Sequence, residues 1–284
     1  MISQVTLSDG TVLPAIGEGT WYLGENKSAW EEEKRSLIAG VHAGMKLIDT
    51  AEMYGNGRAE ILTGAALKEI GRNNVFLVSK VLPGNAAGAR LEASCNGSLK
   101  RLGTDYLDMY LLHWRGGYPL EETVYGMNRL VHKGKIRRWG VSNFDLEDME
   151  ELWQTLGGSG CLVNQDLYHL GSRGVETALL PWMKEHHVAL MAYCPLAQKG
   201  SLKNGMLQSR AVLEISAARN ATPEQILLAF LIRNGITIAI PRTGNMVHAI
   251  QNAGAGDIQL TDDEYNLLSE AFPAPSHRVP LDIQ

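Results

Sequence analysis

Eight short apolar runs of strand length alternate along this chain with longer helical patterns, and this alternation limits the possible folds more than any other feature. A strand followed by a helix, repeated many times, is typical of a parallel sheet covered by helices. Eight such repeats predict an α/β fold, the (β/α)₈ TIM barrel. The 284 residues suit one barrel of about 250 residues with short additions. No linker divides them, so we expect a single domain over residues 1–284. The expected strands end near Thr20, Asp49, Lys80, His113, Ser142, Gln165, Tyr193 and Ile240.

Segments beyond the minimal repeat predict additions to the barrel. The pair Asp9-Gly10 separates two short alternating segments and indicates an N-terminal β-hairpin that could plug one end of the barrel. An extra helix is expected over residues 206–219. Another is expected after the capping box at 261–264, followed by a tail over 272–284.

Several helices of the repeat have recognisable start signals. Ser28 and Glu31 form a capping-box pattern that predicts a helix to about Ala43. The same pattern at 222–225, with Pro223 at the first helical position, predicts a helix to about residue 233. Two further helices are expected over 147–156 and 175–186.

Composition excludes several classes of function. The formal net charge of −5 argues against nucleic acid as a partner, because binding phosphate backbones needs clustered Lys and Arg. The basic run over 133–138 is interpreted as a solvated connection between a helix and a strand. Cys95, Cys161 and Cys194 stand far apart without metal-ligand spacing, so we expect reduced thiols and no metal site. No leader pattern and no apolar run of membrane-spanning length is present, which predicts a cytoplasmic protein with no membrane partner.

Four ionisable side chains lie at or just beyond the ends of expected strands, where barrel enzymes build their active sites. They are Asp49, Tyr54, Lys80 and His113. A phenol has a pKa of about 10 and is a reluctant acid near neutrality, so Tyr54 needs a neighbouring charge. We expect the Lys80 ammonium to lower the pKa of Tyr54 and Asp49 to hold Lys80. His113 is suited to orienting a carbonyl oxygen.

These residues belong to a series of short motifs. In chain order they are Gly19-Thr20-Trp21, Asp49-Thr50-Ala51 with Tyr54, Ser79-Lys80, Leu112-His113-Trp114, Gly140-Val141-Ser142-Asn143, Asn164-Gln165, Tyr193 with Pro195-Leu196, and Ile240-Pro241-Arg242. Together they resemble the aldo-keto reductases over the whole chain. The resemblance implies reduction of aldehyde or ketone carbonyls by hydride transfer from NADPH. It also implies that Asp49, Tyr54 and Lys80 are catalytic together with His113, and that Tyr54 is the general acid.

The resemblance also implies a set of cofactor-binding residues. In the family, the positions of Ser142, Asn143 and Gln165 grip the nicotinamide amide, and the ring stacks on the position of Tyr193. The segment 241–252 replaces a Gly-x-Gly-x-x-Gly phosphate loop, which the chain lacks. The full set is Gly19, Thr20, Trp21, Asp49, Ser142, Asn143, Gln165, Tyr193, Cys194, Pro195, Leu196, Ile240, Pro241, Arg242, Thr243, Gly244, Asn245, His248, Gln251 and Asn252.

Four of these positions depart from the pattern that is common in the family. Arg242 stands where Lys is common, His248 where Arg is common, Gln251 where Glu is frequent and Cys194 where Ser is frequent. A planar guanidinium near a helix start suits the 2′-phosphate of NADPH, whereas a neutral histidine weakens the phosphate clamp. We expect NADPH to be preferred and NADH to bind more weakly.

Aromatic residues predict an open substrate site. Trp21, Tyr22, Tyr54, His113 and Trp114, with Met53, are expected to line a cup that suits small aldehydes such as methylglyoxal and aromatic aldehydes. The loop 114–121 and the tail are too short to enclose a steroid.

Alternatives remain open at this stage. Arg115 or His169 could favour an acidic substrate. A catalytically slow, cofactor-sensing regulatory subunit and a metal-dependent barrel are the rival functions. We expect a monomer that acts on a small carbonyl compound.

Overall fold

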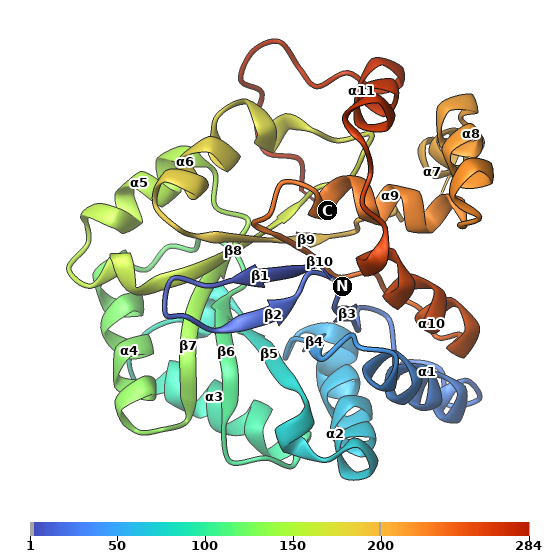
Figure 1. Ribbon diagram of the computed structural model, residues 1–284. Coiled ribbons are helices and arrows are strands. Elements are labelled where there is room, and N and C mark those ends of the chain that lie inside the picture. Colours follow the sequence, from blue (N-terminus) through green and yellow to red (C-terminus); the bar gives the residue numbers. More distant parts are fainter. Residues whose placement is uncertain (1–2, 199, 284) are drawn as a thin grey trace.

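The computed structural model describes residues 3–198 and 200–283. Eight parallel strands follow one another in sequence order around a barrel (Figure 1). The last strand meets the first, because Gly17 N–H donates to the Ala239 carbonyl at 2.9 Å and Gly19 N–H donates to the Pro241 carbonyl at 3.0 Å. The predicted (β/α)₈ barrel is confirmed. Its strands are β3 (Glu18–Gly19), β4 (Leu47–Asp49), β5 (Phe76–Val81), β6 (Leu107–Leu112), β7 (Ile136–Ser142), β8 (Cys161–Leu167), β9 (Ala189–Tyr193) and β10 (Thr237–Ala239).

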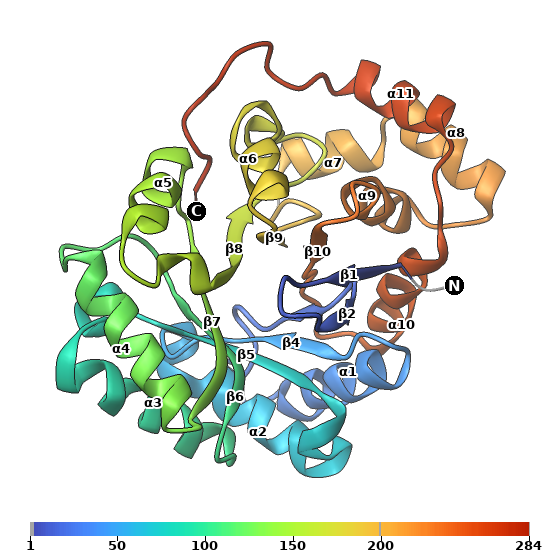
Figure 2. The ribbon, with the colours of Figure 1, turned by 60° about the vertical axis from the view of Figure 1, so that its left-hand side comes forward.

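Helices surround the barrel on its outer side, as the turned view in Figure 2 shows. Most strands are therefore buried on both faces, which explains their nearly continuous apolar sequences. The helices are α1 (Trp30–His42), α2 (Arg58–Ile70), α3 (Gly88–Leu102), α4 (Leu120–His132), α5 (Leu146–Gln154), α6 (Leu179–Glu185), α7 (Ser201–Leu207), α8 (Arg210–Arg219), α9 (Pro223–Ile232), α10 (Met246–Gly254) and α11 (Asp262–Ala271).

The predicted N-terminal hairpin is confirmed as β1 (Gln4–Thr6) paired antiparallel with β2 (Val12–Pro14). Arg138, near the start of β7, donates to Asp9 and to the Thr11 hydroxyl. The hairpin therefore lies at the end of the barrel where the strands begin. The opposite end, where they finish, is left for the site.

The errors in the predicted secondary structure concern where helices begin and end. The Ser28 capping box is wrong: the Ser28 hydroxyl donates to Asn26, and α1 begins after Ala29 with no side-chain cap. The single helix expected over 206–219 is instead two helices, α7 and α8, separated at residues 208–209.

Two other expected helices are shorter than predicted. Over 175–186 the chain forms a 3₁₀ turn (Gly174–Thr177) and then the short α6, because Pro181 lacks an N–H and is accommodated only near a helix start. The helix expected over 147–156 is α5, which is capped by Asp145 and ends at Gln154. The capping boxes at Thr222 and Thr261 are confirmed.

The tail after α11 runs in an extended course along the outside of the barrel towards α5 (Figure 2). Arg278 pairs with Asp145 at 3.2 Å and also with Glu147, and Ser172 donates to Asp282. These contacts fix the tail beside α5 and the loop after β8. None of its described residues lines the main cleft.

Candidate active site and cofactor cleft

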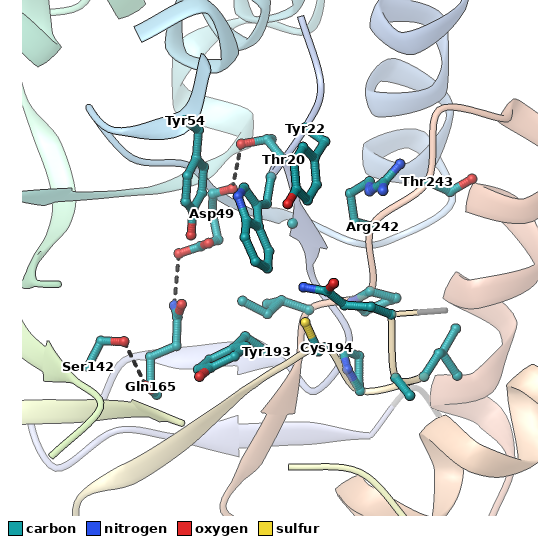
Figure 3. A pocket seen from close by; sticks show the side chains of 18 of the residues that line it. Thr20, Tyr22, Asp49, Tyr54, Ser142, Gln165, Tyr193, Cys194, Arg242 and Thr243 are labelled. Atoms are coloured by element: carbon teal, nitrogen blue, oxygen red, sulfur yellow. Dashed lines mark hydrogen bonds between the residues drawn. The ribbon is translucent and has the colours of Figure 1, made fainter. Parts of the chain in front are cut away.

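A cleft of about 950 Å³ opens at the carboxyl ends of the strands (Figure 3). It is large enough for a dinucleotide and a small second molecule. Most of the predicted site residues line it. Its lining is Gly19, Thr20, Trp21, Tyr22, Asp49, Met53, Tyr54, His113, Trp114, Ser142, Asn143, Gln165, Tyr193, Cys194, Pro195, Leu196, Ala197, Gln198, Gly200, Lys203, Asn204, Ile240, Pro241, Arg242, Thr243 and Gly244.

Lys80 lies behind this wall and joins two of the other predicted catalytic residues. Its side chain is fully buried, and its ammonium donates to Asp49 Oδ2 at 2.6 Å, to the Thr50 carbonyl at 3.1 Å and to Tyr54 Oη at 2.9 Å. All three ammonium protons therefore have acceptors. Residues 55 and 56 both have a φ of 55°, and this sharp turn after β4 places the Tyr54 ring over Lys80.

Burial is the largest influence on the pKa values of Asp49, Tyr54 and Lys80. It lowers the pKa of Lys80 and raises that of Asp49, while their mutual attraction acts in the opposite direction on each. Burial, followed by the charge of Asp49, raises the pKa of Tyr54 well above its usual value. Any lowering of the Tyr54 pKa by Lys80, as expected from the sequence, therefore does not outweigh burial in the protein by itself. The phenol keeps its proton near neutrality, which is the form that a general acid requires.

His113 is a neutral group at the same wall. Burial, followed by the Lys80 charge, lowers the pKa of His113 to about 2. Its Nδ1 atom is buried and has no hydrogen-bond partner among the described residues. We infer that the ring proton is on Nε2, because a buried Nδ1–H would require an acceptor. His113 is thus suited to donate a hydrogen bond to a carbonyl oxygen.

The aromatic cup predicted for the substrate forms around these groups. The Trp21 ring stacks on Tyr54 at 6.2 Å and on Tyr22 at 4.7 Å, and the His113 and Trp114 rings are 5.0 Å apart. Tyr22 and Trp114 are partly exposed, so the cup is open to solvent. Few of the described residues that form the cup are charged.

The two residues that could have favoured an acidic substrate lie outside the cleft. Arg115 donates to Glu151 at 3.0 Å. His169 is buried, which lowers its pKa to about 4. Neither belongs to the described lining, so the acidic-substrate alternative loses its support.

A group of mutually bonded polar side chains lies beside the cup. Asn143 donates to the His113 carbonyl and the Ser142 hydroxyl, both at 3.1 Å, and accepts from the Tyr193 hydroxyl at 2.8 Å. Gln165 donates to Asp49 Oδ1 at 2.9 Å (Figure 3). These bonds fix the orientation of each amide before anything binds.

A local irregularity in the sheet brings this polar group together. The register between β7 and β8 shifts between Trp139 and Val141. At Gly140 a Cβ atom would lie 2.4 Å from the Val163 carbonyl oxygen, so only glycine allows this approach. The shift sets Ser142 opposite Gln165.

The end of the cleft at which Arg242 lies, away from Asp49 and Tyr54, is cationic (Figure 3). Apart from Asp49, which is paired with Lys80, the charged residues of the described lining are Arg242 and Lys203. Neither cation has an acidic partner within residues 3–198 and 200–283. An anion-binding site has this character, and it fits the phosphates of a nicotinamide dinucleotide.

Four predicted cofactor residues do not line this cleft, namely Asn245, His248, Gln251 and Asn252. Asn245 caps α10 by accepting from the backbone N–H groups of residues 247 and 248. Asn252 is buried inside the same helix. Their assignment to the cofactor stays a prediction.

Sequence reasoning missed the wall formed after β9. Ala197, Gln198, Gly200, Lys203 and Asn204 line the cleft there. The stretch lacked a periodic pattern. The available signal for a phosphate contact was Lys203, which stands two residues after the Gly200-Ser201 pair in the segment that follows β9.

Within the described residues, no group of three or more His, Cys, Asp or Glu side chains is arranged to hold a metal ion. In the same part of the chain, no helix is long and apolar enough to cross a membrane.

Comparison with known proteins gives consistent results. The Aldo/keto reductase family model matches residues 15–272. Methylglyoxal reductase YeaE of Escherichia coli (strain K12) is 50% identical over 280 residues, which are 99% of this chain and 98% of the relative.

Solved structures agree with this similarity. An aldo/keto reductase from Klebsiella pneumoniae, crystallised with NADP and acetate, has a TM-score of 0.97 and 48% identity, with 100% of both chains covered. The thermostable aldo-keto reductase Tm1743, crystallised with the inhibitor epalrestat, has a TM-score of 0.86 and 36% identity over 95% of this chain and 99% of that one.

Proposed function

This chain belongs to the aldo-keto reductase family, and on that premise we propose that it reduces small reactive aldehydes and dicarbonyls, such as methylglyoxal and aromatic aldehydes, to alcohols. NADPH supplies the hydride that reduces the carbonyl carbon. The observation that carries the proposal is the buried Lys80 ammonium 2.9 Å from Tyr54 Oη, at the wall of an open aromatic cup.

The chain's own residues have separate tasks in this reaction. Tyr54 gives its proton to the carbonyl oxygen as charge develops there. Burial alone would make the resulting phenolate very costly, and the adjacent Lys80 ammonium lowers that cost. His113 donates a hydrogen bond that fixes the carbonyl oxygen near the Tyr54 hydroxyl.

The cofactor-binding residues fit NADPH along the length of the cleft. The amides of Asn143 and Gln165 are held in place to receive a flat carboxamide, and the Tyr193 ring offers a face for stacking. At the cationic end, Arg242 is assigned to the 2′-phosphate because a guanidinium forms charge-assisted hydrogen bonds with it. A ribose hydroxyl gains less, so NADPH is preferred over NADH.

The regulatory alternative is not supported. A cofactor sensor does not need a complete proton-transfer group, and here Asp49, Lys80 and Tyr54 are hydrogen-bonded together beside His113. A metal-dependent barrel receives no support from the described residues either. A cytoplasmic monomer remains our expectation.

A panel of carbonyl compounds tests the proposal. Initial rates of NADPH oxidation should be highest with methylglyoxal, other small dicarbonyls and aromatic aldehydes, and low with steroids. The assay repeated with NADH should give a higher KM for the cofactor. If a steroid or a carboxylate-bearing keto acid outperformed the small aldehydes about tenfold in kcat/KM, roughly 1.4 kcal/mol of transition-state preference, the open-cup account would be wrong.

A further inference from the structure

Tyr22 has an unusual backbone for a large side chain. Its φ is 66°, in the left-handed region that bulky residues rarely adopt. The turn is closed by Leu23 N–H donating to the Thr20 carbonyl at 2.9 Å. The side chain is nevertheless 49% exposed, so burial of the ring does not explain the conformation. Strain of this kind at a cleft indicates a local task.

The Tyr22 ring lies between the aromatic cup and the cationic end of the cleft (Figure 3). On one side it stacks on Trp21, with the ring centroids 4.7 Å apart and the planes inclined by 18°. On the other side, Arg242 Cζ lies 5.9 Å from the Tyr22 ring centroid. This distance is within the range of a cation–π interaction.

Among the described residues, no carboxylate pairs with the Arg242 guanidinium. It makes no hydrogen bond or ion pair with a residue of 3–198 or 200–283, whereas Arg173 and Arg219 each pair with a glutamate. An aromatic face attracts the cation without using its five N–H donors. A carboxylate in that place would occupy those donors and would have to be displaced by a phosphate.

We propose that Tyr22 is a positioning residue that holds Arg242 ready for the 2′-phosphate and thereby contributes to the preference for NADPH. This inference rests on the proposed function, which assigns Arg242 to that phosphate. The stacked Trp21 supports the Tyr22 ring from the side of the cup.

Calorimetric titration with NADPH and with NADH tests the proposal in a double-mutant cycle. The variants are Tyr22→Asn, Tyr22→Phe, Arg242→Ala and the pair Tyr22→Asn/Arg242→Ala. Asparagine tolerates a positive φ, so Tyr22→Asn removes the ring without straining the turn. Tyr22→Phe keeps the ring and is the conservative control.

We expect Tyr22→Asn to raise the Kd of NADPH about two- to fivefold, as for an exposed cation–π contact, and to leave the Kd of NADH nearly unchanged. Tyr22→Phe should restore the wild-type value. In the Arg242→Ala background, Tyr22→Asn should have no further effect, because Tyr22 acts through Arg242.

Two outcomes would overturn the inference. One is an equal loss for both cofactors on Tyr22→Asn, and the other is a loss that persists in the Arg242→Ala background, since a merely structural role of Tyr22 would produce either. If Arg242→Ala itself weakened NADPH and NADH equally, the assignment of Arg242 in the proposed function would fail instead.

Discussion

The catalytic end and the phosphate end of the cleft are held in place in different ways. At the catalytic end, Lys80 is fully buried and bonded to three oxygens that come from β4 and the turn after it. The phosphate end, by contrast, is assigned to cations outside the strands: Arg242 follows β10 and Lys203 lies on α7, and neither has an acidic partner in the described residues.

This difference follows from the physics of the two tasks. Proton transfer depends on hydrogen-bond distances, so a displacement of about 1 Å costs a large factor in rate. Attraction between a cation and a phosphate declines slowly with distance, so residues on loops and short peripheral helices can supply it. We therefore expect substitutions at the catalytic end to lower both the stability of the protein and the reaction rate. Substitutions at the phosphate end should lower only the affinity for the cofactor.

Lys80→Met should give the largest effect on stability. It would leave the buried Asp49 carboxyl without its cation, and removing one partner of a buried pair typically costs about 3–5 kcal/mol. Urea unfolding measures the loss. The double variant Asp49→Asn/Lys80→Met is the control, and it should recover much of the stability without recovering activity. A single variant as stable as the wild type would show that the catalytic end is less constrained than we argue.

Arg242→Ala should affect affinity and leave stability unchanged. Losing charge-assisted hydrogen bonds to a phosphate should weaken NADPH about 10- to 150-fold, because such bonds contribute roughly 1.5–3 kcal/mol. NADH should lose little. Titration of both cofactors measures the difference, and equal losses would remove the distinction between a 2′-phosphate site and a general anion site.

The catalytic end should also be the pH-sensitive one. The pKa of folded His113 is about 2, whereas an unfolded histidine has about 6.5. Below pH 6.5 the unfolded chain binds a proton that the folded one does not, so His113 contributes stability above pH 6.5 that is lost as the pH falls towards 2. Between pH 6.5 and 4.5, unfolding free energy should fall less steeply in His113→Asn, by up to about 1.4 kcal/mol per pH unit. Parallel slopes for the two proteins would mean that His113 is not buried in its neutral form.

Lys203→Met should give the smallest effect. We assign Lys203 to the pyrophosphate, which both cofactors contain, and a half-exposed cation contributes little in water. NADPH and NADH should each weaken about two- to fivefold, and the effect should shrink as salt is added. A loss confined to NADPH would place Lys203 at the 2′-phosphate instead.

The difference between the catalytic end and the phosphate end also explains which features of the site could be predicted from the sequence. Asp49, Lys80 and His113 follow apolar runs whose strand period fixes where they emerge, so their meeting was predictable from the barrel alone. The net direction of the Tyr54 pKa was not, because it depends on how completely the ring is buried. Sequence patterns do not report this quantity.

Loops and helix starts were harder to predict. The contribution of Lys203 depends on the path of the segment after β9, and the Ser28 box failed because Asn26 provides a competing local bond. Tyr22 was expected in the cup, but its position beside Arg242 depends on a positive φ that no motif announced.

The central claim is that Tyr54 delivers the proton while other residues hold the cofactor. Single-turnover reduction of methylglyoxal by Tyr54→Phe, followed by stopped-flow with saturating NADPH and combined with a Kd titration, tests it most directly. The account predicts a rate reduced about 10²- to 10⁴-fold, with the Kd of NADPH within about twofold of wild type. A variant that kept more than half of the wild-type rate would contradict it.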